Sequence, residues 1–150
     1  MMLETLRLRK DEPVTEAPLA LDAFLEQPEA SAVRIEAGED VRRLVPVLDR
    51  VQLVEIDFPK LRDGRGFSSA RILREEGYEG EIRATGDVLV DLIFFMQRCG
   101  IDSFRPNVPF DPEDAENALK RWPHVYQHAA DAKGPNRRVP IWELRHGGNT

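Results

Sequence analysis

The chain has 150 residues and a formal net charge of −6, with 41% hydrophobic and 32% charged residues. This size and composition predict one soluble globular domain with its own core, and the acidic balance argues against a general nucleic-acid binder, which carries a basic face. The single cysteine, Cys99, excludes a disulfide within the chain and any iron–sulfur cluster or zinc site made of cysteines alone.

The first part of the chain is polar and lacks the apolar core of a signal peptide, so residues 1–16 are expected to form a flexible arm or an added edge strand. A short helix is expected to start near Pro18, since proline suits the first turn of a helix. The longest unbroken apolar run, LIFFM at 92–96, is too short to cross a bilayer. We therefore expect a cytoplasmic protein with no membrane partner.

Strand-like and helix-like segments alternate along the centre of the chain. Alternating or continuous apolar patterns predict strands at 32–37, 51–57, 80–85 and 101–106. Helical spacing of apolar residues predicts helices at 39–50, 68–77, 86–100 and 111–122. The expected N-caps of these helices are Asp40, the pair Ser68 and Ser69, Asp87, and Asp111. Pro46 should kink or shorten the first of them.

This alternation is typical of right-handed βαβ units, and it predicts an α/β domain over residues 17–125 with a mainly parallel sheet of about four core strands. A doubly wound open sheet is the first interpretation, and an arrangement resembling half of a βα barrel is the alternative. Residues 126–150 are expected to form a tail that packs on the domain or on a partner.

The segment DFPKLRDGRGFSSARIL, at 57–73, joins the strand at 51–57 to the helix that follows it. In an open parallel sheet, ligands bind outside the carboxyl ends of the strands, and a helix N-terminus there favours an anion. The residues expected to bind an anion are Lys60, Arg62, Gly64, Arg65, Gly66, Ser68 and Ser69. The cations would neutralise the ligand, the glycines would let the backbone approach it, and the serines would donate hydrogen bonds.

The same residues also have a purely structural interpretation, in which the cations are solvated or paired with nearby acids and the serines only cap the helix. Neither GxxxxGK[ST] nor a complete GxGxxG is present, so the segment is neither a P-loop nor a dinucleotide-binding fingerprint. If the protein is catalytic, the candidate proton carriers are Asp57, Asp63 and Asp87, of which Asp87 is most simply a helix cap.

Other chemistry-bearing residues point less clearly to a function. His124 and His128 have the i, i+4 spacing of a metal pair, but Pro123 and the lack of nearby acids favour surface histidines, so no metal is expected. Cys99 ends an apolar helix and is expected to be a core thiol. Trp142 lies in the tail and is either a docking anchor or a contact with the chain's own domain.

Three segments, VEIDFPKLRDGRGFSSARILRE, GEIRATGDVLVDLIFFMQRCGIDSF and AENALKRW, resemble a bacterial family of uncharacterised proteins from assimilatory sulfate-reduction (cysteine biosynthesis) gene clusters. Members of that family are often labelled oxidoreductases of sulfite reduction. The resemblance covers roughly residues 45–125. It implies a place in cysteine biosynthesis from sulfate, with sulfite reductase or its electron donor as expected partners.

The first functional expectation is therefore an accessory protein of sulfate or sulfite reduction that binds an oxyanion or a phosphate-bearing ligand at the basic segment. An alternative is a non-catalytic docking or assembly module for the reductase or its electron donor, and a further alternative is a free-standing oxidoreductase. The cofactor is unknown, because the sequence has no nicotinamide or flavin fingerprint. No iron–sulfur cluster or zinc ion of its own and no nucleic-acid partner are expected.

Overall fold

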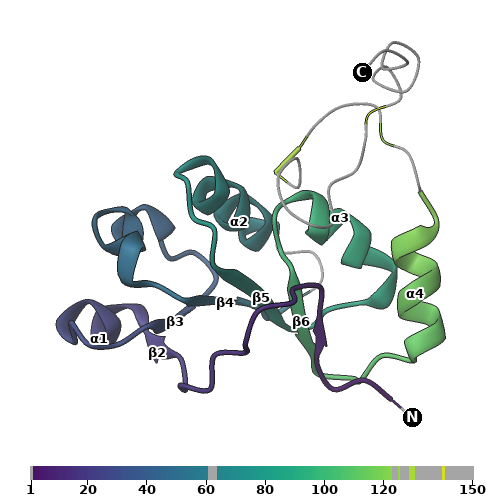
Figure 1. Ribbon diagram of the computed structural model, residues 1–150, viewed down its shortest axis with the longest axis horizontal. Helices are drawn as coiled ribbons and strands as arrows, with labels where there is room; N and C mark the ends of the chain where they lie inside the picture. The colour runs from purple at the N-terminus through teal and green to yellow at the C-terminus, as the bar shows by residue number, and fades with distance from the viewer. Residues whose placement is uncertain (1, 61–63, 123–124, 126–128, 131–139, 141–150) are drawn as a thin grey trace.

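The computed structural model describes residues 2–60, 64–122, 125, 129–130 and 140, and all structural statements below concern these residues. The strands are β1 (Leu6–Arg7), β2 (Leu19–Ala20), β3 (Ala32–Ile35), β4 (Leu53–Phe58), β5 (Glu81–Gly86) and β6 (Ser103–Pro106) (Figure 1). The helices are α1 (Leu21–Glu26), η1 (Val41–Arg50), α2 (Arg65–Glu75), η2 (Val90–Leu92), α3 (Ile93–Arg98) and α4 (Pro112–Lys120), with η1 and η2 in the 3-10 form.

Within these residues the strands form one open sheet in the order β1-β6-β5-β4-β3-β2. Strands β2 to β6 are all parallel, and β1 adds to the β6 edge in the antiparallel direction. The predicted α/β fold with a mainly parallel sheet is confirmed. Two short edge strands, β1 and β2, extend the four predicted core strands.

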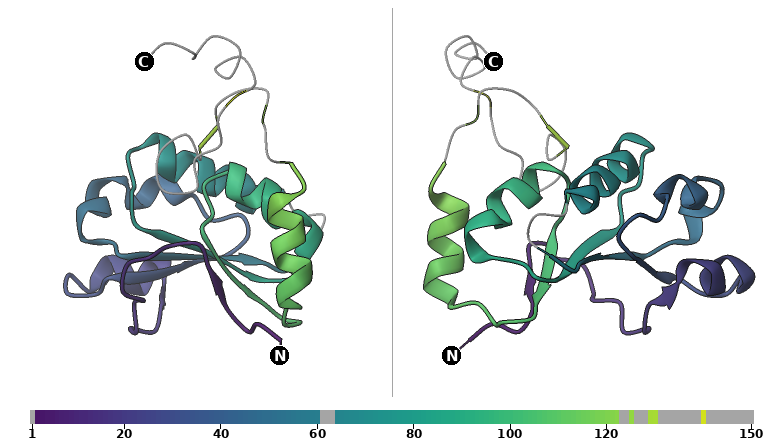
Figure 2. Two further views of the ribbon diagram at one scale, coloured as in Figure 1. Left: turned by 45° about the vertical axis from the view of Figure 1, so that its right-hand side comes forward. Right: turned by 180° about the vertical axis from the view of Figure 1, so that it is seen from behind.

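The order of the parallel strands decides between the two predicted architectures. From β2 to β6, the strands follow one another in chain order without a reversal. Crossovers of one hand between such strands place all the connecting helices on one face, whereas a doubly wound sheet needs a switch point. Figure 2 shows η1, α2 and α3 on the same side of the sheet. The structure is therefore the half-barrel-like alternative, and the doubly wound interpretation is wrong.

The two faces of the sheet differ in chemistry. On β4, Val54, Ile56 and Phe58 belong to the buried core beneath the helices, together with side chains of the neighbouring strands and of α2. Because side chains alternate along a strand, Glu55 and Asp57 project from the opposite face. We call this second face the polar face, and its polar residues are Arg34, Glu55, Asp57, Glu81, Arg83, Thr85, Ser103 and Arg105.

Two predicted helices differ from the structure at their starts. The helix predicted at 68–77 begins at Arg65, so Gly64 is its N-cap and the prediction that Ser68 and Ser69 cap it is wrong. The helix predicted at 86–100 begins only at Val90, as η2, and continues as α3 without a side-chain cap on either. A positive φ of 92° at Gly86 turns the chain there, so the segment before Val90 is not helical.

The other predicted caps agree with the structure. The Asp40 side chain accepts a hydrogen bond from the backbone N–H of Arg42 at the start of η1. Pro46 lies inside η1, which is 3-10 throughout; proline has no N–H and its ring clashes with the carbonyl four residues earlier in an α-helix. Asp111 caps α4 through the N–H groups of Glu113 and Asp114, with proline at the first helical position.

The N-terminal segment is hydrogen-bonded to the domain along two edges of the sheet. Leu3 exchanges backbone hydrogen bonds with Phe110, and β1 then pairs with β6. The chain continues past the amino ends of the strands, where the side chain of Arg9 bonds to Asp102 and to the carbonyl of Glu79. It reaches the opposite edge of the sheet at β2. None of the described helices is long and apolar enough to cross a membrane.

Candidate functional site

The carboxyl ends of β4 and β5 lie side by side, as expected for adjacent parallel strands. Phe58 pairs with Gly86, and the backbone N–H of Asp87 donates to the Phe58 carbonyl at 2.7 Å. A side chain at Gly86 would place its Cβ 2.5 Å from that carbonyl oxygen, so only glycine fits there. The ends of the two strands thus bring Asp57, Thr85 and Asp87 to the same edge as the segment that follows β4.

We call residues 59–69, between β4 and the second turn of α2, the basic loop. Lys60 and Arg65 are both exposed. Arg65 reaches the neighbouring connection between β3 and η1, because a Cβ built on Gly38 would lie 2.7 Å from its Nη1 atom. The remaining predicted members, Arg62 and the candidate proton carrier Asp63, lie outside the described residues. The described cations of the basic loop therefore lie on the connections at the carboxyl edge of the sheet.

The start of α2 has glycine as its N-cap residue. Its N-cap, Gly64, has no side chain and supplies no acceptor for the N–H groups of the first turn. These N–H groups and the helix dipole favour negative charge at the helix start. The peptide dipoles of the eleven residues of α2 sum to give this helix dipole. Among the described residues, a Cβ on Gly64 would meet no atom within 4 Å.

Gly66 has a packing role in this structure. It is buried, and a Cβ on it would lie 2.5 Å from two ring carbons of Phe58. The missing side chain therefore lets the first turn of α2 pack closely on β4. Ser68 and Ser69 fall in the second turn of α2, where the backbone N–H groups are already within the helix. The N–H groups of Arg65 and Gly66 are thus among those of the first turn that have no intrahelical acceptor, whereas the backbone N–H groups of Ser68 and Ser69 lie within the helix.

On the polar face, the guanidinium of Arg34 contacts three carboxylates. Its Nε atom lies 2.9 Å from Glu36, and its terminal nitrogens lie 3.0 Å from Glu55 and 3.3 Å from Asp57. These residues come from β3, the segment after it, and β4. A guanidinium is suited to such an arrangement because its planar fork carries five donors.

Burial raises the pKa of Asp57 above the usual value for an aspartate. The nearby Arg34 charge opposes this shift, whereas the carboxylates of Glu36 and Glu55 add to it because like charges disfavour ionisation. An acid whose pKa is raised toward neutrality is better suited to exchange a proton with a ligand than an ordinary surface aspartate. Asp57 is therefore a candidate proton carrier whose pKa is raised in the folded chain.

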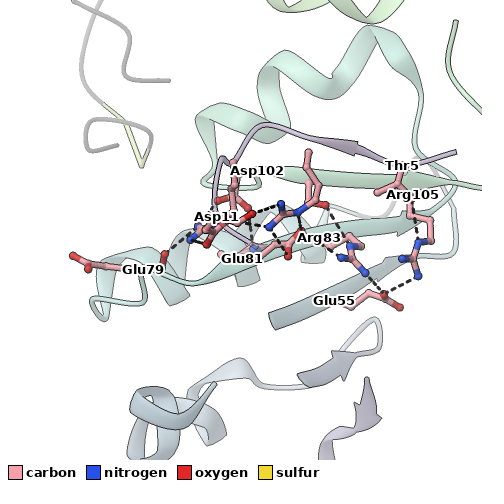
Figure 3. A network of polar contacts seen from close by, with 12 residues as sticks. Thr5, Asp11, Glu55, Glu79, Glu81, Arg83, Asp102 and Arg105 are labelled. Atoms are coloured by element: carbon pink, nitrogen blue, oxygen red, sulfur yellow. Dashed lines mark hydrogen bonds and ion pairs between the residues drawn. The ribbon is translucent and has the colours of Figure 1, made fainter. Parts of the chain in front are cut away.

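Glu55 lies at the centre of the polar face and is only 5% exposed. Its Oε1 atom accepts from Arg34, while its Oε2 atom lies 3.7 Å from Nη1 of Arg83 and 3.9 Å from Nη1 of Arg105 (Figure 3). These two separations are too long for hydrogen bonds. Within the described chain, Oε2 is buried and accepts no hydrogen bond.

The arginines on either side of Oε2 are held differently. Arg83 is buried and donates to the Ser103 hydroxyl and to Glu81, both at 3.3 Å. Arg105 comes from β6 and has a side chain 52% exposed; among the described residues it makes a long contact of 3.5 Å to the Thr5 hydroxyl besides its approach to Glu55. Arg83 is thus fixed in the sheet, whereas the side chain of Arg105 is exposed.

The sequence interpretation did not single out Arg34, Glu55, Arg83 or Arg105. A signal was present, because charged residues recur at every second position of the strands, as in VRI at 33–35 and VEID at 54–57. Such alternation usually indicates a solvated face. The alternation alone does not show which charges on neighbouring strands lie next to one another, because the register of the strands is visible only in the structure.

The described residues hold no group of three or more histidine, cysteine, aspartate or glutamate side chains arranged for a metal ion. His124 and His128 lie outside those residues, as does Trp142. Cys99 forms no disulfide and is partly buried at the end of α3.

The geometry defines this chain as an α/β protein with a singly wound, half-barrel-like sheet, whose carboxyl edge carries exposed cations, the start of α2 with glycine at its N-cap, and the partly buried Asp57 carboxylate. The family described as bacterial protein of unknown function (DUF934) matches residues 32–137, and the chain belongs to that family. The match covers β3 to α4, the part of the fold that forms this edge. Searches of curated proteins and of solved structures give no significant match.

Proposed function

We propose that this protein binds a small oxyanion, or a ligand bearing a phosphate group, at the basic loop. The observation that carries the proposal is the start of α2, where a helix without a side-chain N-cap begins between the exposed cations Lys60 and Arg65 at the carboxyl end of β4. Backbone N–H groups and flexible cations together are the chemistry that recognises a phosphate or sulfate group.

The pathway in this proposal comes from the sequence resemblance to proteins of assimilatory sulfate-reduction gene clusters. Sulfate and sulfite are themselves small oxyanions, and adenylyl sulfate carries both a sulfate and a phosphate group. An accessory protein of this pathway would thus have its ligands among the class that the basic loop suits. Asp57 would be the proton carrier if the bound anion reacts, since its pKa is raised and it is the last residue but one of β4, directly before the loop.

Thermal unfolding tests the proposal directly, because a ligand that binds the folded state raises its stability by mass action. The purified protein is unfolded in the presence of sulfite, sulfate, phosphate, adenylyl sulfate, nicotinamide dinucleotides and flavins, at constant ionic strength. The double variant Lys60→Gln/Arg65→Gln removes the two described cations of the loop. The control variant Arg71→Gln/Lys120→Gln removes two equally exposed cations of the helices.

The expected result is a rise in the unfolding temperature with an oxyanion or phosphate-bearing ligand, lost in the loop variant and kept in the control. Equal shifts in both variants would show only general anion effects on stability. No shift with any ligand would contradict the proposal.

A second candidate function, a docking module for sulfite reductase or its electron donor, is favoured by exposed apolar side chains beside α3 and α4. Phe95 and Trp122 are each 55% exposed, and Leu89 is 43% exposed. The ion pair between Arg121 and Asp91 places the end of α4 next to η2. Exposed aromatic residues are common anchors of protein interfaces. Association with the reductase that is lost in Phe95→Ser/Trp122→Ser, without any small-ligand shift, would support this second function.

A further inference from the structure

We propose a second anion site, on the polar face of the sheet, in which Arg105 binds an oxyanion and Glu55 selects one that carries a proton. This site lies on the face opposite α2 and does not depend on the basic loop. Its ligand class is a small oxyanion with at least one hydroxyl group, such as hydrogen phosphate, dihydrogen phosphate or hydrogen sulfite, in preference to fully ionised sulfate.

The first argument is the state of Glu55 Oε2. A buried carboxylate oxygen that accepts no hydrogen bond is costly, because it has lost water and gained no donor. Nearly all buried polar atoms in folded proteins have a donor or acceptor partner, so the position facing Oε2 is where a further donor belongs. The carboxylate itself is held in place by the bond from Arg34 to its other oxygen.

The second argument is the pair of guanidinium groups on either side of that oxygen. Nη1 of Arg83 and Nη1 of Arg105 lie 3.7 and 3.9 Å from Oε2, beyond hydrogen-bond distance but close enough to share one small group with it. A group between them would accept hydrogen bonds from the two arginines and donate one to Glu55. A hydroxyl of a protonated oxyanion does both, and its other oxygens can accept from Arg105.

The third argument is the exposure of Arg105. Glu55 Oε2 is buried, so a ligand reaches it only when the group above it moves. Arg105 is that group, because its side chain is half exposed and its contacts with Thr5 and Glu55 are long. Figure 3 shows Arg105 and Arg83 converging on Glu55 from neighbouring strands. Binding transfers the Arg105 guanidinium from Glu55 to the anion.

Selectivity follows from the charge of Glu55. Sulfate has no proton near neutral pH, so each of its oxygens would face the Glu55 carboxylate as one acceptor against another. Phosphate keeps at least one proton under the same conditions and donates it to Oε2. A hydrogen bond between charged partners is worth more than a neutral one, and a carboxylate facing an acceptor is penalised. Phosphate is therefore expected to bind at least about tenfold more tightly than sulfate.

Isothermal titration calorimetry of the full chain with inorganic phosphate and with sulfate, slightly below neutral pH and at constant ionic strength, measures this preference. The variants are Glu55→Gln, Arg105→Gln, the loop variant Lys60→Gln/Arg65→Gln, and Arg71→Gln as a control on the exposed face of α2. Circular dichroism establishes that each variant is folded.

In the wild-type protein, phosphate is expected to be preferred. Glu55→Gln should weaken phosphate binding and strengthen sulfate binding, because the amide N–H can donate to either anion, so that the two differ by less than about threefold. Arg105→Gln should weaken phosphate binding about tenfold or more, since it removes a charged donor. The loop variant and Arg71→Gln should keep the preference for phosphate.

Equal affinity for the two anions in the wild type, or a preference that survives in folded Glu55→Gln, overturns the proposal. If Glu55→Gln does not fold, unchanged phosphate affinity in Arg105→Gln overturns it instead. Loss of all binding in the loop variant alone would support the basic loop and reject the polar-face site, whereas binding that is lost only in the polar-face variants would do the reverse. Binding of neither anion means that the position facing Glu55 holds only water, which also overturns the proposal.

Discussion

Arg105 on β6 reaches across β5 to Glu55 on β4, with its Nη1 atom 3.9 Å from Oε2. The strand between them contributes Arg83, which approaches the same oxygen, and Thr85, which is buried. Charged side chains on three adjacent strands therefore meet at one carboxylate. On the polar face, adjacent strands are linked through these charged contacts, whereas on the face under the helices they are linked through apolar packing.

The close packing of α2 on β4 predicts that Gly66→Ala destabilises the protein. The added Cβ would lie 2.5 Å from the Phe58 ring, which is buried and cannot move away freely. Overpacking of this kind costs about 1–3 kcal/mol in the free energy of unfolding. Urea unfolding measures the loss, and Gly64→Ala is the matched control, since a Cβ there meets none of the described residues within 4 Å. A Gly66→Ala protein as stable as Gly64→Ala would contradict the described packing.

The polar face also predicts a large effect of removing Arg83. This side chain is buried and lies between the carboxylates of Glu55 and Glu81, which would then lose a neutralising charge. Breaking a buried ion pair from one side costs about 3–5 kcal/mol, and the remaining bonds from Arg34 and Arg7 should keep the loss near the lower value.

Chemical unfolding of Arg83→Ala gives this loss, and Arg71→Ala provides the comparison. Arg71 pairs with Glu75 on the exposed surface of α2, where an ion pair contributes less than about 1 kcal/mol. Similar stabilities of the two variants would show that the charges of the polar face are solvated.

A carboxyl titration followed by NMR should show Asp57 ionising above the usual range for aspartate, because the folded chain buries it. Asp11 is the internal reference, since hydrogen bonding from Arg9 lowers its pKa to about 2. Arg34→Gln should raise the pKa of Asp57 further, because the charge of Arg34 opposes the shift. An Asp57 pKa at or below the usual value would contradict the burial described for it.

The same shift predicts how stability depends on pH. The folded state holds the Asp57 proton more tightly than the unfolded state, so this group stabilises the fold fully below its unfolded pKa, and that stabilisation is lost as the pH rises through the raised folded pKa. Asp57→Asn has no such loss. Its free energy of unfolding should therefore increase relative to the wild type between acidic and neutral pH, as measured by urea unfolding across that range.

The sequence predicts much of the fold because its apolar patterns are local. The strand predicted at 51–57 corresponds to β4 at 53–58, and Asp111 with Pro112 marks the start of α4 correctly. The helix predicted from residue 86 starts late because its apolar run begins inside a turn. That turn is set by the positive φ at Gly86 and by the hydrogen bond of Asp87 to Phe58, and neither can be recognised from apolar spacing.

The candidate site is only partly predictable for a related reason. Lys60 and Arg65 follow a predicted strand, so their place at its carboxyl end can be expected from topology alone. The role of Gly66 depends on the position of the Phe58 ring, which is a tertiary contact. The meeting of Arg34, Glu55 and Arg105 depends on the order and register of three strands. Pairing across a sheet is not encoded in any single segment of the sequence.

The most direct test of the central claim, that a small oxyanion binds at the start of α2, is an NMR titration of the uniformly ¹⁵N-labelled protein with sulfite and with phosphate. We expect saturable shifts of the backbone amides at residues 65–67, whose N–H groups have no acceptor within the helix. Amides of the first turn that do not respond, while the protein remains folded and the anion is in large excess, would contradict it.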